Sequence, residues 1–272
     1  MKKIAFINNK GGVGKTATVV SVAHMLATKY NKKVLIVDLD PQMNTTMIYS
    51  NVDFVSIFKQ IYMGNFENKT KSVETLLLDR NADIHDCILH TDYENLDIIQ
   101  SCLTLSEAEE RIKGDVISPQ QFKLRKHLAK VEDEYDYCLI DTSPSLSIVN
   151  INGLVAADEI YIPLKCDGCS LLGVAIIMNI VNVVKESNPE LQIGGIFFTQ
   201  WNGRKNVSKV VYELLNESFG EYILPITIAT SKNLEEITLM QIPLLAHDNG
   251  KNKSKATKDY IKLTEYILHR NE

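Results

Sequence analysis

The chain has little of several features that would assign it to a special class of protein. Its 272 residues contain no apolar run of membrane-spanning length, no Pro- or Ser-rich linker, no low-complexity tract and no internal repeat. The 5 cysteines are an odd number at unrelated spacings, which is typical of reduced thiols rather than of a disulfide framework. Because no signal peptide precedes the first predicted strand, we expect a cytoplasmic protein.

An excess of positive charge is also missing. The formal net charge is −5, which disfavours a general affinity for nucleic acids. Two local clusters of basic residues contrast with this average: Arg204, Lys205 and Lys209, and then Lys251, Lys253, Lys255 and Lys258. Such clusters are usually only a solvated face, so charge alone leaves both assignments open.

The most specific signal lies near the N-terminus. An apolar run at residues 4–7, typical of a buried strand, leads into Asn-Asn-Lys-Gly-Gly-Val-Gly-Lys-Thr at residues 8–16. Its end, Gly14-Lys15-Thr16, is typical of a phosphate-binding loop, in which backbone amides surround phosphate oxygens, the lysine neutralises charge and the threonine hydroxyl binds Mg²⁺. The usual loop has a glycine at the position of Asn9, and here Lys10 follows it. Since its own loop fills the near side, we expect Lys10 to reach a nucleotide held by a facing subunit.

Two later apolar runs end in carboxylates. Residues 33–38 read as a buried strand that leads into Asp38 and Asp40, and residues 135–140 as another that leads into Asp141. Between the first two strands, residues 17–30 carry apolar side chains at helical spacing. This order builds a parallel sheet with ligands at the carboxyl ends of the strands, so all three carboxylates should lie at the nucleotide edge. A carboxylate such as Asp141 suits a water bound to Mg²⁺.

The rest of the chain repeats the pattern. Predicted strands at residues 159–164, 193–199 and 223–228 alternate with helical stretches, and residues 257–268 form a last helix that suits packing on the domain. We read residues 51–95 as short helices. The sequence therefore predicts one domain, residues 1–272, with an α/β doubly wound, mostly parallel sheet and helices on both faces.

Residues 10–16 resemble the deviant Walker A motif, KGGxGK[ST], of the ParA/MinD group of P-loop ATPases. Residues 38–44 are similar to the DxDPQxN switch I of that group, and Asp141 to the end of its Walker B strand, although Ser143-Pro144 stands where the family has two prolines. The resemblance implies that Asp40 orients the attacking water, with Lys10 and Lys15 supporting catalysis. The cofactors that it implies are ATP and Mg²⁺.

The resemblance also implies a set of binding residues. Those for ATP are Lys10, Gly11, Gly12, Val13, Gly14, Lys15, Thr16, Ala17 and Asn202. Those for the metal are Thr16, Asp38 and Asp141. Asn202 corresponds to the family's adenine contact, and an asparagine that caps the next helix is the alternative. The family's Pro-Arg-Asn turn is absent at residues 228–233, so those contacts do not carry over.

As a member of this group without a helix-turn-helix domain before the P-loop, the chain is similar to the short, Soj-like form of ParA. That implies plasmid or chromosome segregation by an ATP-dependent homodimer on nonspecific double-stranded DNA, released when a ParB-like centromere-binding protein stimulates hydrolysis. The expected location is the nucleoid, without membrane contact. The expected DNA-binding residues are Arg204, Lys205, Lys209 and Lys232.

Two other classes remain open. A MinD-like membrane ATPase needs a basic amphipathic C-terminal helix, whereas the last helix here includes Asp259 and Glu265. A metal-cluster carrier would use the pair Cys166 and Cys169, but no second pair or nearby histidine accompanies it. A structural loop is the alternative for that pair.

Overall fold

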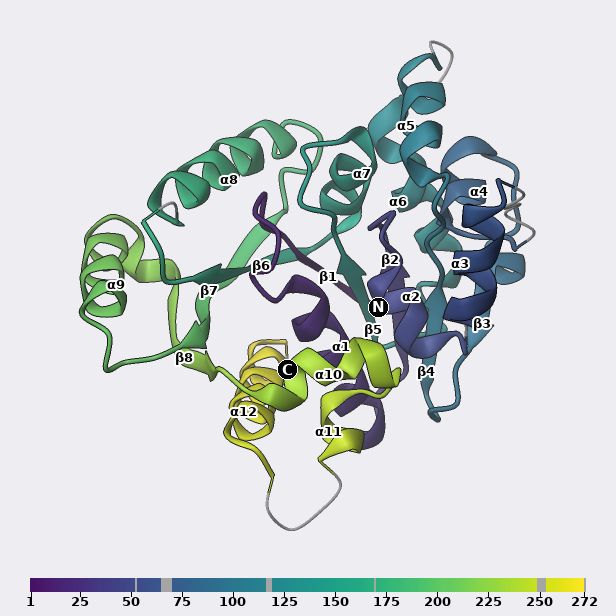
Figure 1. Ribbon diagram of the computed structural model, residues 1–272. Helices are drawn as coiled ribbons and strands as arrows, with labels where there is room; N and C mark the ends of the chain where they lie inside the picture. The colour runs from purple at the N-terminus through teal and green to yellow at the C-terminus, as the bar shows by residue number, and fades with distance from the viewer. Residues whose placement is uncertain (52, 65–69, 116–118, 169, 249–252, 272) are drawn as a thin grey trace.

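The computed structural model describes residues 1–51, 53–64, 70–115, 119–168, 170–248 and 253–271 (Figure 1). Within them, an 8-stranded sheet has the order β3-β4-β2-β5-β1-β6-β7-β8. All neighbouring strands are parallel except β3 and β4, which are antiparallel. The strands are β1 Lys2–Phe6, β2 Val34–Asp38, β3 Ile88–His90, β4 Leu96–Ile99, β5 Tyr137–Asp141, β6 Glu159–Lys165, β7 Gln192–Trp201 and β8 Ile223–Ala229.

The central strands are continuous apolar runs because both faces of the sheet are covered. All five residues of β2 and all five of β5 are buried. Their register pairs Asp38 with Asp141, so the two carboxylates leave the sheet side by side. The strand β1 pairs with β5 on one side and β6 on the other, which sets the loop after β1 at the middle of the sheet.

Helices cover both faces of the sheet (Figure 1). One apolar core joins the sheet to α4, α5, α6, α7, α8 and α9, and a second joins it to α1, α2, α10, α11 and α12. The helices are α1 Lys15–Thr28, α2 Asn44–Tyr49, α3 Phe54–Tyr62, α4 Val73–Leu78, α5 Leu105–Lys113, α6 Lys123–Leu128, α7 Ile148–Ala156, α8 Ser170–Val184, α9 Asn206–Phe219, α10 Lys232–Met240, α11 Leu244–His247 and α12 Lys255–Arg270. Short 3₁₀ turns are His85–Cys87, Gln120–Phe122, Ala129–Val131 and Gly220–Tyr222. The predicted doubly wound α/β fold is confirmed.

The close approach of α7 to the sheet helps to set the position of the loop after β2. A methyl group at Gly153 would lie 2.7 Å from Cδ1 of Leu39 and 3.2 Å from Cγ2 of Ile140. Leu39 stands between the two predicted site residues Asp38 and Asp40. Because Gly153 has no side chain, α7 can pack closely against Leu39 in this loop.

Some predicted elements differ from the structure. Residues 51–95 contain the helices α3 and α4, but also the edge strand β3, which the prediction of short helices missed. The first predicted helix, at residues 17–30, begins earlier, at Lys15, because the loop glycines lead directly into its first turn. The last helix is longer than predicted and buries Tyr260, Leu263 and Ile267 against the second core. Among the described helices, none has both the length and the apolar character needed to cross a membrane.

Candidate active site

The loop between β1 and α1 has the backbone of a phosphate-binding loop. Gly12 has φ +71° and Gly14 has φ +87°, both in the left-handed region that favours glycine. Gly14 precedes the first residue of α1 directly. The N-terminus of this helix, with its free N–H groups and the positive end of its dipole, therefore faces the loop, as anion binding requires.

Lys15 is buried at the base of this loop. Its Nζ donates to the backbone oxygen of Asn8 at 2.9 Å and to that of Lys10 at 3.2 Å. Burial lowers the pKa of the Lys15 ammonium, while Asp141 and Asp40 oppose the shift. A phosphate group in the loop would favour the charged ammonium further.

Asp141, at the end of β5, accepts two hydroxyl hydrogen bonds on one oxygen. Thr16 Oγ1 lies 2.8 Å and Thr45 Oγ1 2.7 Å from Asp141 Oδ2. The other oxygen, Oδ1, is buried and has no hydrogen-bond partner among the described residues. Burial raises the pKa of Asp141, and the two hydroxyls partly oppose this. An unpartnered carboxylate oxygen beside a threonine hydroxyl is the oxygen environment that suits Mg²⁺ and its waters.

Asp38 anchors the segment that follows β2. Its Oδ1 accepts the backbone N–H of Asp40 at 3.0 Å, and its Oδ2 accepts the N–H of Thr46 at 2.9 Å and the Thr46 hydroxyl at 2.7 Å. Burial, and then the nearby Asp141, raise the pKa of Asp38. Both oxygens of Asp38 thus hold the two ends of the segment from Asp40 to Thr46, and its predicted metal role stays a prediction.

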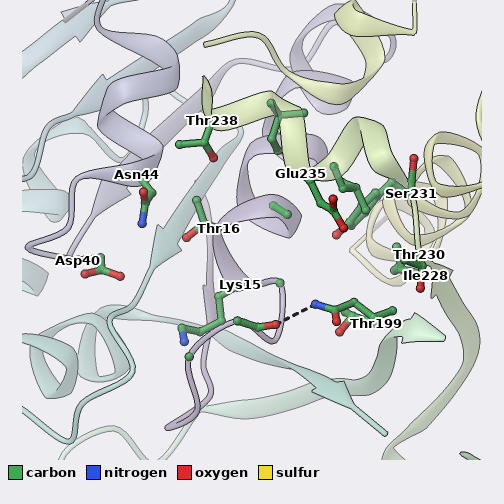
Figure 2. Close-up of a pocket in the computed structure, with 18 of the residues that line it drawn as sticks. Lys15, Thr16, Asp40, Asn44, Thr199, Ile228, Thr230, Ser231, Glu235 and Thr238 are labelled. Atoms are coloured by element: carbon green, nitrogen blue, oxygen red, sulfur yellow. Dashed lines mark hydrogen bonds between the residues drawn. The ribbon is translucent and has the colours of Figure 1, made fainter. Parts of the chain in front are cut away.

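Asp40 lies within this segment and faces the cavity. Its Oδ1 accepts the N–H of Gln42 at 3.0 Å, and only 7% of the residue is exposed. Burial raises its pKa, and the bond from Gln42 and the charge of Lys15 lower it. Within the described ranges, no donor is bonded to the second oxygen of Asp40, which can therefore orient a small polar molecule. Figure 2 shows Asp40, Asn44 and Thr16 toward one end of the cavity.

The cavity beside the loop has a volume of about 500 Å³, within the range of small-molecule sites. Its opposite end carries Thr230, Ser231 and Glu235, from the end of β8 and the helix α10 (Figure 2). The lining residues are Gly11, Gly12, Gly14, Lys15, Thr16, Ala17, Asp40, Gln42, Asn44, Pro144, Thr199, Gln200, Ile228, Thr230, Ser231, Leu234, Glu235, Ile237, Thr238 and Tyr260. The structure thus brings together most of the predicted loop, including Gly11, Gly12, Gly14 and Ala17, with the switch residue Asp40.

Not every predicted residue lines this cavity. Val13 is buried and lines a second cavity on the other side of the loop, together with Lys10. Asn202 is exposed, and its Oδ1 accepts the N–H of Arg204 at 3.1 Å. The N-cap of α9 is Lys205, so Asn202 does not cap this helix as the alternative predicted, and the base contact of Asn202 stays a prediction. Its neighbour Gln200 lines the cavity and donates to Gly12 O at 2.9 Å.

The two lysines of the loop point to different places. Lys15 lines the main cavity, whereas the Lys10 ammonium forms an ion pair with Asp167 in the loop after β6. The second cavity, about 310 Å³, is lined by Lys10 together with Leu172 and Ile176 of α8. Lys10 is therefore directed away from the cavity of its own loop, and its expected reach to a nucleotide in a facing subunit stays a prediction.

The predicted DNA-binding residues lie at the starts of two helices. Arg204 and Lys205 precede α9, Lys209 lies in its first turns, and Lys232 is the first residue of α10. All four are exposed. Of the second basic cluster, Lys251 lies outside the described residues.

Cysteine chemistry has limited support at the predicted pair. Burial raises the pKa of the Cys166 thiol to about 11, so burial disfavours the thiolate form that binds metals. Cys169 lies outside the described residues. Among the residues that the structure covers, no three His, Cys, Asp or Glu side chains converge on a common metal position. A Mg²⁺ ion that takes most of its ligands from water and phosphate needs no such cluster.

Comparisons with known proteins agree with this geometry. Residues 1–193 match the family model described as an AAA domain. The chain is 31% identical to the chromosome-partitioning ATPase Soj of Treponema pallidum, over 99% of this chain and 98% of that protein. A crystal structure of a plasmid partition protein from Borrelia burgdorferi is 26% identical, with a TM-score of 0.71 over 99% of each chain.

A further solved structure is that of cobyrinic acid a,c-diamide synthase from Mycobacterium smegmatis with a bound ATP analogue and magnesium. It is 26% identical, with a TM-score of 0.78 over 100% of this chain and 96% of that one. The match to Soj, in turn, runs through nearly the whole of both chains and includes the loop, both carboxylate-bearing strands and α10. The resemblance read from the sequence is therefore confirmed: the chain belongs to the Soj/ParA family of partitioning ATPases.

Proposed function

We propose that the protein is a ParA-type DNA-segregation ATPase, in which ATP bridges two copies of the chain into a sandwich dimer that binds DNA nonspecifically. The observation that carries the proposal is the divergence of the two loop lysines. Lys15 serves the cavity of its own loop, while Lys10 is directed out of it toward Asp167. A lysine in that place is available to the phosphates of a nucleotide held by a facing copy.

The proposed cofactors are ATP and Mg²⁺. The loop amides, with Lys15, would hold the phosphates. Thr16 with Asp141 would hold the hydrated metal, because one oxygen of Asp141 is buried with no partner in the described part of the chain. The adenine would occupy the end of the cavity formed by Gln200, Ser231 and Glu235. A bound Mg²⁺ supplies charge neutralisation at the phosphates.

Hydrolysis then depends on positioning. Asp40 is fixed by Asp38 through its backbone and turned toward the cavity, so it would hold the attacking water in line with the leaving oxygen. Lys15 and the loop amides would stabilise the charge that spreads over the transferred phosphoryl group, and Lys10 of the facing copy would add to it. Asp38 would act by holding the switch segment.

The DNA contact would use exposed basic side chains at the starts of α9 and α10, namely Arg204, Lys205, Lys209 and Lys232. Such residues bind phosphates without regard to sequence. Since the chain is acidic overall, the contact must be local. A ParB-like centromere-binding partner would then stimulate hydrolysis and release the dimer from the nucleoid.

A membrane-positioning ATPase is the main rival. The apolar side of α12 is packed on the second core, which leaves little for a lipid surface. Co-sedimentation with anionic liposomes distinguishes the two, since ATP-dependent lipid binding would favour the rival. Iron and zinc content after anaerobic purification tests the metal-carrier class, for which we expect neither metal.

The test of the proposed function is ATPase activity titrated with duplex DNA, with and without the protein encoded by the adjacent gene. We expect low basal hydrolysis that rises when DNA and that protein are both present. ATPase activity that depends neither on DNA nor on that protein would argue against a DNA-segregation ATPase.

A further inference from the structure

The buried hydroxyl of Thr45 has no role in the scheme above. Thr45 is fully buried at the start of α2, and its Oγ1 donates to Asp141 Oδ2 at 2.7 Å. Thr16 Oγ1, from α1, donates to the same oxygen at 2.8 Å. Two donors from two different elements therefore fix one oxygen of this carboxylate, whereas Oδ1 accepts no hydrogen bond from any residue that the structure describes.

The two hydroxyls have different remaining capacity. A hydroxyl carries one proton and two lone pairs. Thr16 can therefore keep donating its hydrogen bond to Asp141 while one of its lone pairs faces a cation. Thr16 also lines the main cavity, whereas Thr45 does not. Thr45 is therefore suited to holding Asp141 rather than to binding a ligand directly.

Thr45 also belongs to the segment that carries Asp40. The next residue, Thr46, is bonded through its N–H and its hydroxyl to Asp38, and its hydroxyl accepts the N–H of Ser101 at 2.9 Å. The following turn accepts a bond from α10, because Gln241 Nε2 lies 2.8 Å from Met47 O. The helix α2 is thus held at several points, and its side-chain bond to the carboxylate at the end of β5 comes from Thr45.

We propose that Thr45 is a positioning residue that couples switch I to the metal site. By holding Asp141 Oδ2 together with Thr16, it keeps Oδ1 for a metal-bound water and ties the segment of Asp40 to the same carboxylate. Without the Thr45 hydroxyl, the carboxylate turns more freely, and Thr16 competes with the metal-bound water for its oxygens. This inference rests on the proposed binding of ATP with Mg²⁺.

The test measures binding rather than turnover. A fluorescent, non-hydrolysable ATP analogue is titrated at increasing Mg²⁺ concentration, and again in EDTA. For Thr45→Val, which keeps the shape and removes the hydroxyl, we expect the Mg²⁺ concentration for half-maximal binding to rise about tenfold, as for the loss of one hydrogen bond to a charged group. Metal-free binding should stay within about twofold of the wild type, because the loop amides and Lys15 are unchanged.

Matched variants separate this role from a general loss of structure. Thr45→Ser restores the hydroxyl and should return the Mg²⁺ dependence to the wild-type value. Thr45→Cys, with its weak donor, should give an intermediate shift and also serves if the valine variant does not fold. Ser50→Ala removes a hydroxyl at the other end of α2, where Ser50 Oγ donates to Thr46 O at 2.5 Å, and should leave the Mg²⁺ dependence unchanged.

The opposite outcomes are equally clear. Folded Thr45 variants with the wild-type Mg²⁺ dependence would overturn the inference, as would an equal loss of binding with Mg²⁺ and in EDTA. If the wild type itself does not bind the analogue, the proposed function fails first. A wild type that binds, with variants that do not differ from it, rejects the role of Thr45 alone.

Discussion

At the scale of single residues, we expect Lys10 to serve assembly rather than nucleotide binding. Its ammonium is paired with Asp167 and points away from the main cavity. We expect Lys10→Ala to keep ATP binding, because Lys15 and the loop amides remain, and to lose ATP-dependent dimerisation. Light scattering with and without ATP measures this, with the control Lys33→Ala at an exposed lysine just before β2.

A Lys10→Ala variant that dimerises as fully as the wild type would show that this lysine does not act across an interface. The ion pair itself contributes little to folding, because both of its side chains are partly exposed. We therefore expect no marked loss of thermal stability in the variant, which keeps the dimerisation result interpretable.

We expect Asp40 to serve ATP turnover rather than ATP binding. Its carboxylate faces the cavity that Lys15 also lines, and the bond between Thr16 and Asp141 does not depend on it. In Asp40→Ala we expect hydrolysis to fall by about a hundredfold or more, as for lost positioning of the nucleophile. ATP binding should persist, so the variant should accumulate as an ATP-bound dimer.

Single-turnover hydrolysis and equilibrium ATP binding, measured on the same preparation, check this. Thr16→Ala serves as the contrast, since it removes a hydroxyl of the proposed metal site and should weaken nucleotide binding itself. Hydrolysis by Asp40→Ala at the wild-type rate would mean that another group holds the water.

At the scale of elements, α1 contains a buried histidine, His24, that makes the free energy of unfolding depend on pH. His24 packs edge-on against Tyr93, with ring centroids 4.6 Å apart, and its Nδ1 has no hydrogen-bond partner among the described residues. Burial lowers the pKa of His24 to about 4. Between its ordinary pKa and this value, the unfolded chain takes up a proton that the folded chain does not, so stability falls as the pH falls.

We expect His24→Phe to have a shallower loss of stability on acidification. Between about pH 7 and about pH 5, the wild type should lose about 1 to 2 kcal/mol of unfolding free energy more than the variant. Urea denaturation at both pH values gives the difference. Equal losses in the two proteins would mean that His24 becomes protonated inside the fold.

Part of the candidate site could be predicted from the sequence, and part could not. The loop glycines, Lys15 and Asp141 follow directly from motif and strand position, because the carboxyl ends of parallel strands must meet at one edge. Gln200 and Thr45 could not be predicted in this way. Gln200 has a left-handed backbone near the end of β7, and the contact of Thr45 depends on how α2 packs against the end of β5. The wall formed by α10 was likewise not predicted, because a helical pattern does not reveal which neighbour the helix will face.

The short edge strand β3 was missed for a related reason. It spans only Ile88–His90, and its residues are partly exposed, so it lacks the continuous apolar run of the central strands. Its pairing with β4 is a tertiary contact that local periodicity does not encode. The strands β2 and β5 are buried on both faces, so their continuous apolar composition is enough to predict them as strands.

At the scale of the whole molecule, the proposed DNA contact has to be local on an acidic chain. Arg204 and Lys205 are exposed between β7 and α9. We expect Arg204→Ala with Lys205→Ala to weaken DNA binding, without a change in nucleotide binding or dimerisation. If both residues contact phosphates, the fall of log affinity with log salt should become shallower, because fewer counterions are released.

Fluorescence anisotropy with a labelled duplex at several salt concentrations gives that slope. The matched control is Lys185→Ala with Lys126→Ala, which removes the same charge from exposed positions outside the two basic helix starts. An unchanged slope in the Arg204 and Lys205 variant would move the DNA contact elsewhere, with Lys232 and the lysines at 253–258 next to test.

In the proposed function, the bound nucleotide controls a DNA-binding dimer. The most direct measurement is the affinity of the wild-type chain for a random-sequence duplex, by anisotropy, with ATP and Mg²⁺, with ADP and Mg²⁺, and without nucleotide. We predict binding with ATP that is lost with ADP and in the Lys10→Ala variant. DNA binding of equal strength in all three nucleotide states, or in none, would contradict the account.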